Sequence, residues 1–513
     1  MKISEMFLGQ TDANNEMQTL TENGFLRLFE DIPGCSIDKL LDGSAAFVCG
    51  DKGTGKTMLL RFAELQAKQA ASPTRFIRYK RDIGERDHTL LNQTAASNGD
   101  IEACDDGIQK TNVNLVLAWK LYLIKNIVDL IRESAENIVE RNDAWNDLCA
   151  LIDDIYLGGN NKPIRTILPK ITKGQIRIKT THAELILDCE PSNSEDRRVH
   201  FSDAAETVVD CYRELIADND CNCPIYIFID EIELHYSKRK EYERELKMVG
   251  CLVSAVDSLN SIAREKGLQA HIVLALRNEV HRATVNLGAE INKPIEDFGM
   301  QLNWRTKTSE ESQPLLHIVE TRIRHNYEER GLAISDVWSS LFPDEIDGAD
   351  IKSYLIRQTW YKPRDIIRYL NALKARCGEE TRFPRQAFFD VRKEYSAQAW
   401  KEIEEELTAI YKRDQIEAMR KVLNGIRCPF SLADLRKKVE GEISHYQDVE
   451  KLSQEFRDAE LIAILFHAGI IGNVTDSTRD TGRARFVAWE ESEPDLSGKF
   501  TIHYPLRSFF DVR

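Results

Sequence analysis

The eight residues from Gly50 to Thr57, Gly-Asp-Lys-Gly-Thr-Gly-Lys-Thr, constrain the fold of this chain more than any other segment. They follow the apolar run 45–49 and precede Met58-Leu59-Leu60, so the pattern predicts a strand, a glycine-rich loop and the start of a helix. Backbone N–H groups in such a loop, with the positive end of the helix dipole, form a binding site for phosphate oxygens. The alternative is a glycine-rich turn with an incidental lysine. The residues expected to contact a nucleotide are Gly50, Gly53, Thr54, Gly55, Lys56, Thr57 and Met58.

Two side chains of this loop have separate expected roles. Lys56 is placed to reach the β- and γ-phosphates, and the Thr57 hydroxyl is placed to bind Mg²⁺. The sequence therefore predicts a nucleotide site that carries a divalent cation.

A nearly continuous apolar run over residues 224–229 ends in two carboxylates, Asp230 and Glu231. Its β-branched and aromatic residues predict a strand that is buried on both faces of a parallel sheet. Open α/β sheets bind ligands beyond the carboxyl ends of their strands, which is where these carboxylates are expected. Asp230 is a candidate Mg²⁺ ligand, and Glu231 is a candidate for polarising the attacking water. The alternative is an acidic strand end that is exposed to solvent.

Two arginines are further candidates. The apolar run 270–276 predicts a third strand that ends at Arg277 and Asn278, where Arg277 would stabilise charge on the transferred phosphoryl group. The alternative is that Arg277 marks the point where a buried strand meets water. The stretch 360–371 predicts a helix start with Arg364 in its first turn, either reaching back to the phosphates or paired on the surface. The candidate catalytic residues are Lys56, Glu231, Arg277 and Arg364.

Together these motifs resemble the AAA+ and STAND branch of the P-loop ATPases, with the glycine-rich loop as Walker A and the Asp-Glu strand as Walker B. The arrangement is similar to KAP-like and origin-recognition-like ATPases and to bacterial stand-alone P-loop ATPases. The resemblance covers residues 20–80 and 220–513, and it implies ATP and Mg²⁺ as cofactors. It also implies an α/β fold: a P-loop NTPase core with a parallel sheet and a large insertion, a helical lid and a C-terminal winged-helix-like domain. The expected segments are an N-terminal segment 1–44, the core 45–300 with an insertion at about 81–219, the lid 301–396 and the C-terminal domain 397–513.

The insertion has its own pattern of predicted elements. Apolar periodicity predicts helices over 113–139 and 145–155, and alternation predicts a hairpin of strands 176–180 and 183–187. A helix is expected to return at 203–216. We interpret the insertion as a helical and hairpin module seated on the core.

Charge limits where nucleic acid can bind. The net charge of −15 means that the surface as a whole does not attract it, so any contact is expected to be local. The best local candidate is the segment 162–179, because no acidic residue occurs from Asn161 to His182. The alternative is a solvated loop with an exposed hairpin face. The basic residues of this segment are Lys162, Arg165, Lys170, Lys173, Arg177 and Lys179.

The C-terminal region predicts helices followed by a β-hairpin, which is the order of a winged helix. Strands are expected at 485–489 and 500–504, joined by an acidic turn, after an apolar helix over 459–469. That helix is nearly uncharged and the wing is acidic, which favours contact with protein, or packing within the chain, over contact with DNA.

Cysteine usage and hydropathy favour a cytoplasmic protein without a membrane segment. The eleven cysteines are scattered and form no C-x-x-C pair, the N-terminus has no apolar stretch, and no run reaches about eighteen apolar residues. The apolar share of 42% and the charged share of 30% are typical of a folded chain with several domains.

The leading hypothesis is a Mg²⁺-dependent ATP-hydrolysing switch, expected to be a homo-oligomer that regulates or loads a separate effector protein. The resemblance implies a role in bacterial signalling or antiviral defence. One alternative is a DNA-binding, initiator-like ATPase, and another is a nucleotide-binding scaffold without turnover. The candidates for an arginine that acts on a neighbouring subunit are Arg282, Arg322 and Arg324.

Overall fold

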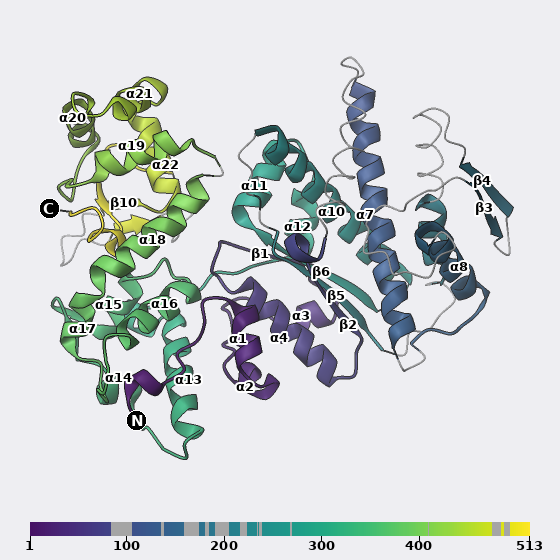
Figure 1. The fold of residues 1–513 in the computed structure, drawn as a ribbon, viewed down its shortest axis with the longest axis horizontal. Helices are drawn as coiled ribbons and strands as arrows, with labels where there is room; N and C mark the ends of the chain where they lie inside the picture. Colours follow the sequence, from purple (N-terminus) through teal and green to yellow (C-terminus); the bar gives the residue numbers. More distant parts are fainter. Residues whose placement is uncertain are drawn as a thin grey trace. The chain divides into compact units, whose positions relative to one another are not determined.

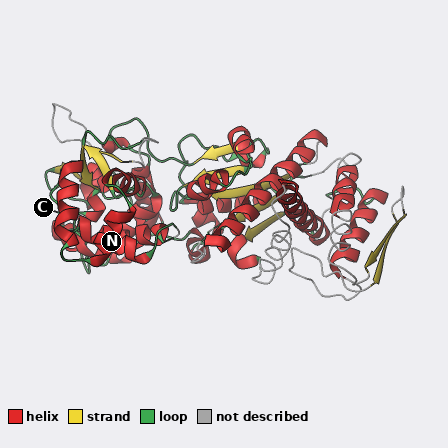
Figure 2. Cartoon of the chain, turned by 90° about the horizontal axis from the view of Figure 1, so that it is seen from above, coloured by secondary structure: helices red, strands yellow, loops and turns green. Residues whose placement is uncertain are grey.

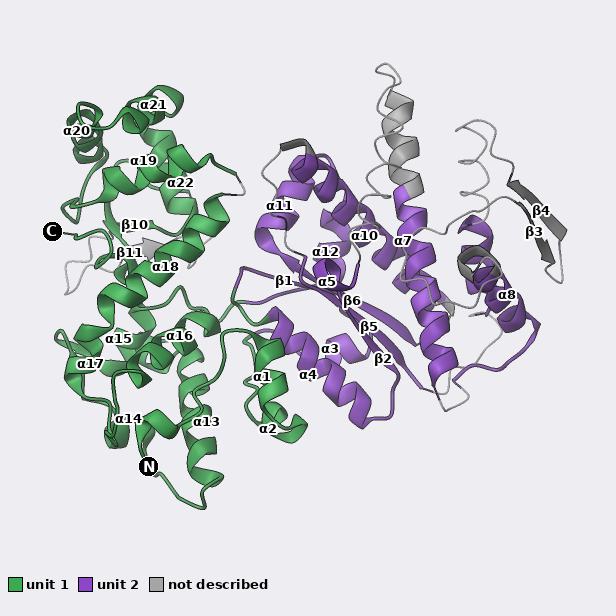
Figure 3. Ribbon diagram, in the orientation of Figure 1, with its two compact units in different colours: residues 1–33, 53–55, 303–513 green, residues 34–52, 56–302 purple. Residues whose placement is uncertain are grey.

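The computed structural model divides the chain into two compact units (Figure 3). Unit 1 comprises Met1–Pro33, Gly53–Gly55 and Asn303–Arg513, and unit 2 comprises Gly34–Lys52 and Lys56–Leu302. The residues that the structure describes are 1–83, 105–134, 138–157, 174–179, 184–189, 205–215, 223–232, 234, 239–266, 269–408, 410–474, 484–486 and 493–512.

Unit 2 is built on a five-stranded sheet with the strand order β2-β5-β6-β1-β7, and the pairings between these strands are parallel. The three strands expected from the apolar runs are confirmed as β1, β5 and β6. All six residues of β5 are buried, as expected for a strand covered on both faces. β6 lies between β1, which leads into the glycine-rich loop, and β5, which ends at Asp230. The bounds are β1 Phe47–Gly50, β2 Thr74–Arg78, β5 Ile225–Asp230, β6 Ala270–Arg277 and β7 Gly299–Gln301.

Helices cover both faces of this sheet (Figures 1 and 2). The helix that follows the glycine-rich loop, α4 (Lys56–Gln69), packs across β1, β2, β5 and β6 on the same face as the short α3 (Asp38–Leu41). The long helices α10 (Arg239–Lys266) and α7 (Asp105–Glu133) pack against each other on the opposite face. The other elements of unit 2 are α5 Tyr79–Asp82, α8 Asp143–Leu157, a helical run at 205–215, α11 Asn278–Asn286, α12 Asn292–Phe298, β3 Gly174–Lys179 and β4 Glu184–Cys189.

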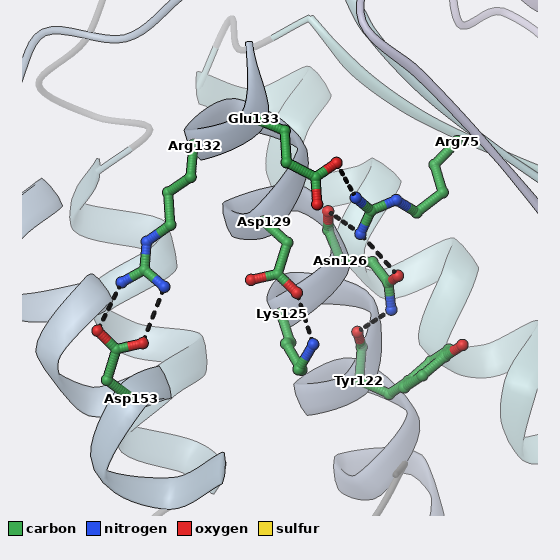
Figure 4. A network of polar contacts seen from close by, with 8 residues as sticks. All are labelled: Arg75, Tyr122, Lys125, Asn126, Asp129, Arg132, Glu133 and Asp153. Atoms are coloured by element: carbon green, nitrogen blue, oxygen red, sulfur yellow. Dashed lines mark hydrogen bonds and ion pairs between the residues drawn. The ribbon is translucent and has the colours of Figure 1, made fainter. Parts of the chain in front are cut away.

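The insertion is partly built into the core of unit 2. The helix expected over 113–139 is present as α7, although it begins earlier and ends at Glu133. It is tied to β2 because Arg75 contacts the Asn126 side chain at 3.2 Å and the Glu133 carboxylate at 2.6 Å (Figure 4). Arg132 forms a two-bond ion pair with Asp153 on α8, at 2.8 and 2.9 Å. α7 therefore completes one face of the sheet instead of standing apart from it. The expected hairpin is confirmed as the antiparallel pair β3-β4.

One helix among the described residues, the Glu241–Glu265 part of α10, is long and apolar enough to cross a membrane. Of its most apolar window, 72% is buried within the protein. Burial of that extent is typical of the core helix of a soluble protein.

Unit 1 is mostly helical (Figure 2). Its longer helices are amphipathic, and their apolar faces form the core of the unit. Its helices are α1 Ala13–Thr19, α2 Glu22–Arg27, α13 Leu315–Glu328, α14 Val337–Leu341, α15 Ile351–Arg357, α16 Pro363–Lys374, α17 Arg385–Asp390, α18 Arg392–Leu407, α19 Arg413–Leu423, α20 Leu432–Ile443, α21 Gln447–Glu455 and α22 Asp458–His467. Its strands are β8 Glu345–Ile346, β9 Ala349–Asp350, β10 Ile471–Val474, β11 Ala484–Phe486 and β12 Lys499–Ile502, and its 3-10 turns are η1 Ile3–Glu5, η2 Glu310–Ser312 and η3 Tyr504–Leu506.

The first residues of the chain are part of the helical core of unit 1. The side chain of Asn326 on α13 exchanges two hydrogen bonds with the backbone of Phe7, at 2.6 and 2.8 Å. Arg322, also on α13, forms a 2.8 Å ion pair with Glu16, and both side chains are buried. Arg322 was one of three candidates for an arginine that acts on a neighbouring subunit. Its burial removes it from them, because such a residue must be exposed on the surface.

The expected pairing of the C-terminal strands is wrong. Parts of both strands are present, as β11 and β12, but each pairs antiparallel with β10 and the sheet order is β11-β10-β12. β10 has the sequence Ile-Gly-Asn-Val, in which glycine and asparagine weaken the strand pattern, so periodicity did not reveal it. A further antiparallel bridge joins Phe430 to Phe500 on the free side of β12. Residues 487–489, also expected in a strand, lie outside the described part.

Candidate functional site

The glycine-rich loop has the strand-loop-helix setting that the sequence predicts. Gly50 is the last residue of β1, and Lys56 is the first residue of α4. Gly53 and Gly55 have φ angles of +85° and +97°, a left-handed conformation that glycine adopts without steric cost. Thr57 and Met58 occupy the first turn of α4 and are partly exposed.

Lys56 is the buried cation of this loop. Its Nζ donates hydrogen bonds to the carbonyl oxygens of Gly50 and Asp51, both at 2.7 Å. Burial, with a smaller contribution from the Arg277 guanidinium, lowers the pKa of Lys56 to about 8, and the charges of Glu279 and Asp230 oppose that shift. Charged groups from β5 and from the end of β6 thus act on the loop lysine. Residues far apart in the sequence meet at one edge of the sheet.

Asp230 and Glu231 lie at the carboxyl end of β5, where the sequence places them. Asp230 is 4% exposed, and its Oδ2 has no hydrogen-bond partner among the described residues. A buried carboxylate oxygen without a partner is costly, which makes it a natural ligand for a cation. Glu231 has a φ of +60°, which is strained for a residue with a side chain, and its carboxylate lies 3.4 Å from the Nε of Arg81.

The end of β6 contributes two neighbouring polar residues. Arg277 is mostly buried and lies 3.5 Å from the Glu279 carboxylate. The Asn278 side chain donates a 2.8 Å hydrogen bond to the Asp51 carboxylate in the glycine-rich loop, and accepts one from Gln301. Asn278 therefore supports the loop directly. The sequence alone could not assign different roles to Arg277 and Asn278, because the two residues are adjacent at the strand end.

Within unit 1, Gly53–Gly55 are held by residues from two other segments of the chain. Trp304 donates from Nε1 to the Thr54 carbonyl at 2.9 Å. The backbone N–H of Arg364 lies 3.4 Å from the Gly53 carbonyl, and a Cβ placed on Gly53 would lie only 3.1 Å from the Arg364 Cβ. Glycine is thus required at position 53 by its φ angle and by the approach of α16. Trp304 carried no recognisable motif, so the sequence could not identify it.

The remaining candidates have different surroundings. Arg282 is exposed on α11, and Arg324 donates to the Ile334 carbonyl at 3.0 Å. Of the basic segment 162–179, residues 162–173 lie outside the described part of the chain, and the rest form β3.

The chemistry of these residues fits a Mg²⁺-nucleotide complex. Mg²⁺ keeps several waters and binds one or two carboxylates together with substrate phosphates, so Asp230 and the Thr57 hydroxyl would be enough protein ligands for it. Within the described part of the chain, no cluster of three or more His, Cys, Asp or Glu side chains is suited to hold a metal ion by itself. A cation at Asp230 would therefore depend on phosphate oxygens for the rest of its coordination.

Residues 313–404 match the FunZ-associated C-terminal helical domain. The matched segment runs from the start of α13 into α18 and includes Arg364, but it contains neither the glycine-rich loop nor β5. The comparison with curated proteins gives no match to this chain. The chain is thus similar to this helical domain over part of unit 1. The match does not extend to the parallel sheet of unit 2, so the role of that unit has to be inferred from its own residues.

Proposed function

We propose that this chain binds ATP with Mg²⁺ at the Gly50–Thr57 loop and hydrolyses it, acting as a switch that regulates a partner protein. The observation that carries the proposal is the arrangement at one edge of the sheet: Lys56 is buried at the start of α4, and β5 ends in the buried carboxylate of Asp230, whose Oδ2 has no hydrogen-bond partner among the described residues. β6 lies between β1, which leads into the loop, and β5, which ends at Asp230. This order also agrees with the additional-strand class of P-loop ATPases.

In this proposal each residue of the site has a separate role in binding or hydrolysing ATP. Backbone N–H groups of the loop and the Lys56 ammonium group bind the phosphates, while Thr57 and Asp230 hold the cation. Bound there, Mg²⁺ would neutralise negative charge on the phosphate oxygens. Glu231 accepts a proton from the attacking water, and Arg277 stabilises the charge that develops on the transferred group.

The proposed role as a switch relies on the resemblance to AAA+ and STAND ATPases. The match to a helical domain over 313–404 is compatible with a lid, and the β11-β10-β12 sheet with the Phe430–Phe500 bridge is compatible with a winged-helix-like domain. We propose ATP over GTP because no N-K-x-D motif for reading guanine follows β5. We further propose homo-oligomers, a separate effector protein and a cytoplasmic setting in signalling or antiviral defence.

The test is phosphate release from ATP by the purified full-length chain. Turnover is expected to stop when EDTA removes Mg²⁺, and Asp230→Asn is expected to raise the Mg²⁺ concentration for half-maximal rate about tenfold. Turnover that persists without divalent cation, or no nucleotide binding at all, would contradict the proposal. Parallel reactions with duplex and single-stranded DNA address the initiator-like alternative, which requires a several-fold acceleration by DNA.

Nucleotide affinity is expected to depend on pH through Lys56. The phosphates bind the protonated amine, and its pKa in the free protein is about 8, so affinity is retained below that pH and declines above it. We expect binding to be about tenfold weaker at pH 9 than at pH 7, measured with a fluorescent ATP analogue. Lys56→Arg serves as control, because a guanidinium stays charged throughout this range and its weaker binding should not change with pH. If the unmodified protein bound the ATP analogue equally tightly at pH 7 and pH 9, the predicted dependence on Lys56 would be wrong.

A further inference from the structure

The first two turns of α16 present Arg364 and Arg368 to one carboxylate of α18, that of Glu402. Arg368 forms a bidentate ion pair with Glu402, with one N···O distance of 2.9 Å. Arg364 lies farther from the same carboxylate, with 3.8 Å between its Nη1 and a Glu402 oxygen. The Arg364 Nε also donates to the Thr11 carbonyl at 3.1 Å. Glu402 is thus held firmly by one arginine and shared loosely with the other.

The backbone around Arg364 is fixed by buried contacts. The Asp365 carboxylate accepts a hydrogen bond from the backbone N–H of Trp360 at 3.1 Å, and Asp365 is 2% exposed. Trp360 in turn donates to the Gly469 carbonyl at 2.9 Å and stacks on His503 with ring centroids 4.6 Å apart. Since this turn is anchored on both sides, the Arg364 guanidinium is the part that can change partner.

We propose that Glu402 is a positioning residue for Arg364, which it holds until the terminal phosphate of a nucleoside triphosphate at Gly53–Gly55 competes for the guanidinium. The inference rests on the proposed function, since it deepens the role of the same loop. A diphosphate lacks the terminal group that competes, so Arg364 favours the triphosphate over the diphosphate, and its contact with Glu402 reduces that preference.

Three features favour this exchange. Arg364 already contacts the loop through Gly53, so its guanidinium starts near the phosphate site. Arg364 and Glu402 are both about one-quarter exposed, so neither charge is trapped by burial. When Arg364 leaves, Glu402 keeps its bidentate contact with Arg368, so no carboxylate is left without a partner.

The test compares two variants that each remove one carboxylate of α18. Glu402→Gln removes the competitor for Arg364. Glu394→Gln removes the 2.7 Å ion pair with Arg376, just beyond the end of α16, and serves as the matched control. Affinities for ADP and for a non-hydrolysable ATP analogue are measured with Mg²⁺. Glu402→Gln is expected to bind the ATP analogue about threefold tighter relative to ADP, the size typical of a partly exposed ion pair, and Glu394→Gln is expected to leave the ratio unchanged.

A double-mutant cycle separates positioning from a general structural effect. In an Arg364→Ala background, Glu402→Gln is expected to leave the ratio of the two affinities unchanged, because the residue it controls is absent. The inference is overturned if Glu402→Gln alters both affinities equally, matches Glu394→Gln, or has the same effect without Arg364. If the unmodified protein binds neither ADP nor the ATP analogue, the proposed function itself is wrong. That outcome can be told apart from a failure of the Glu402 inference alone, in which both nucleotides still bind.

Discussion

Replacing Lys56 with alanine is expected to weaken ATP binding by at least about a hundredfold and to abolish turnover. The side chain is buried at the start of α4 and donates two 2.7 Å hydrogen bonds to loop carbonyls, so it is already positioned in the loop. A charge-assisted contact to phosphate in such a site contributes about 1.5–3 kcal/mol, and Lys56 is expected to contact two phosphates. Isothermal titration calorimetry with ATP and Mg²⁺ measures the loss.

Lys52→Ala is the matched control for this variant. Lys52 lies in the same loop but is only partly buried, so its removal deletes one positive charge without emptying the phosphate site. It is expected to change the affinity less than about threefold. Circular dichroism checks that Lys56→Ala still folds, since the variant leaves the carbonyls of Gly50 and Asp51 without that donor. A folded Lys56→Ala protein that binds ATP as tightly as the unmodified chain would exclude this loop as the nucleotide site.

Local patterns were sufficient to predict the elements that carry the candidate site. The apolar runs before Gly50 and before Asp230 are strands, and the helix after the loop begins at Lys56. These predictions succeed because a short apolar run, a glycine at a left-handed position and a helix start are each determined by a few neighbouring residues. The same reasoning placed Asp230 and Glu231 at a strand end.

Contacts between distant segments could not be predicted in the same way. Nothing near Thr11 indicates that its carbonyl accepts a hydrogen bond from Arg364, and nothing near Trp304 indicates that its indole binds the Thr54 carbonyl. Strand order is a similar case, since the position of β10 between β11 and β12 depends on packing and not on its four residues. The side chains that surround the loop are therefore the part of the site that required the structure.

Replacing Glu231 with glutamine is expected to slow ATP turnover by a factor of about 10² to 10⁴ while changing ATP affinity less than about threefold. Glutamine keeps the shape of the side chain and can occupy the same strained backbone position, but it cannot accept the proton of the attacking water. The two quantities are measured by single-turnover phosphate release and by titration with a fluorescent ATP analogue. Glu290→Gln, at an exposed position of unit 2, controls for the loss of one negative charge.

The same variant tests whether ATP drives assembly. If the ATP-bound form oligomerises, Glu231→Gln is expected to accumulate a larger species with ATP, because hydrolysis no longer returns the protein to its resting state. Light scattering that gives an unchanged monomer mass would contradict the oligomeric part of the proposal. Turnover equal to that of the unmodified chain would instead show that Glu231 is not the base. Its ion pair with Arg81, 3.4 Å away, would then point to a structural role for the carboxylate.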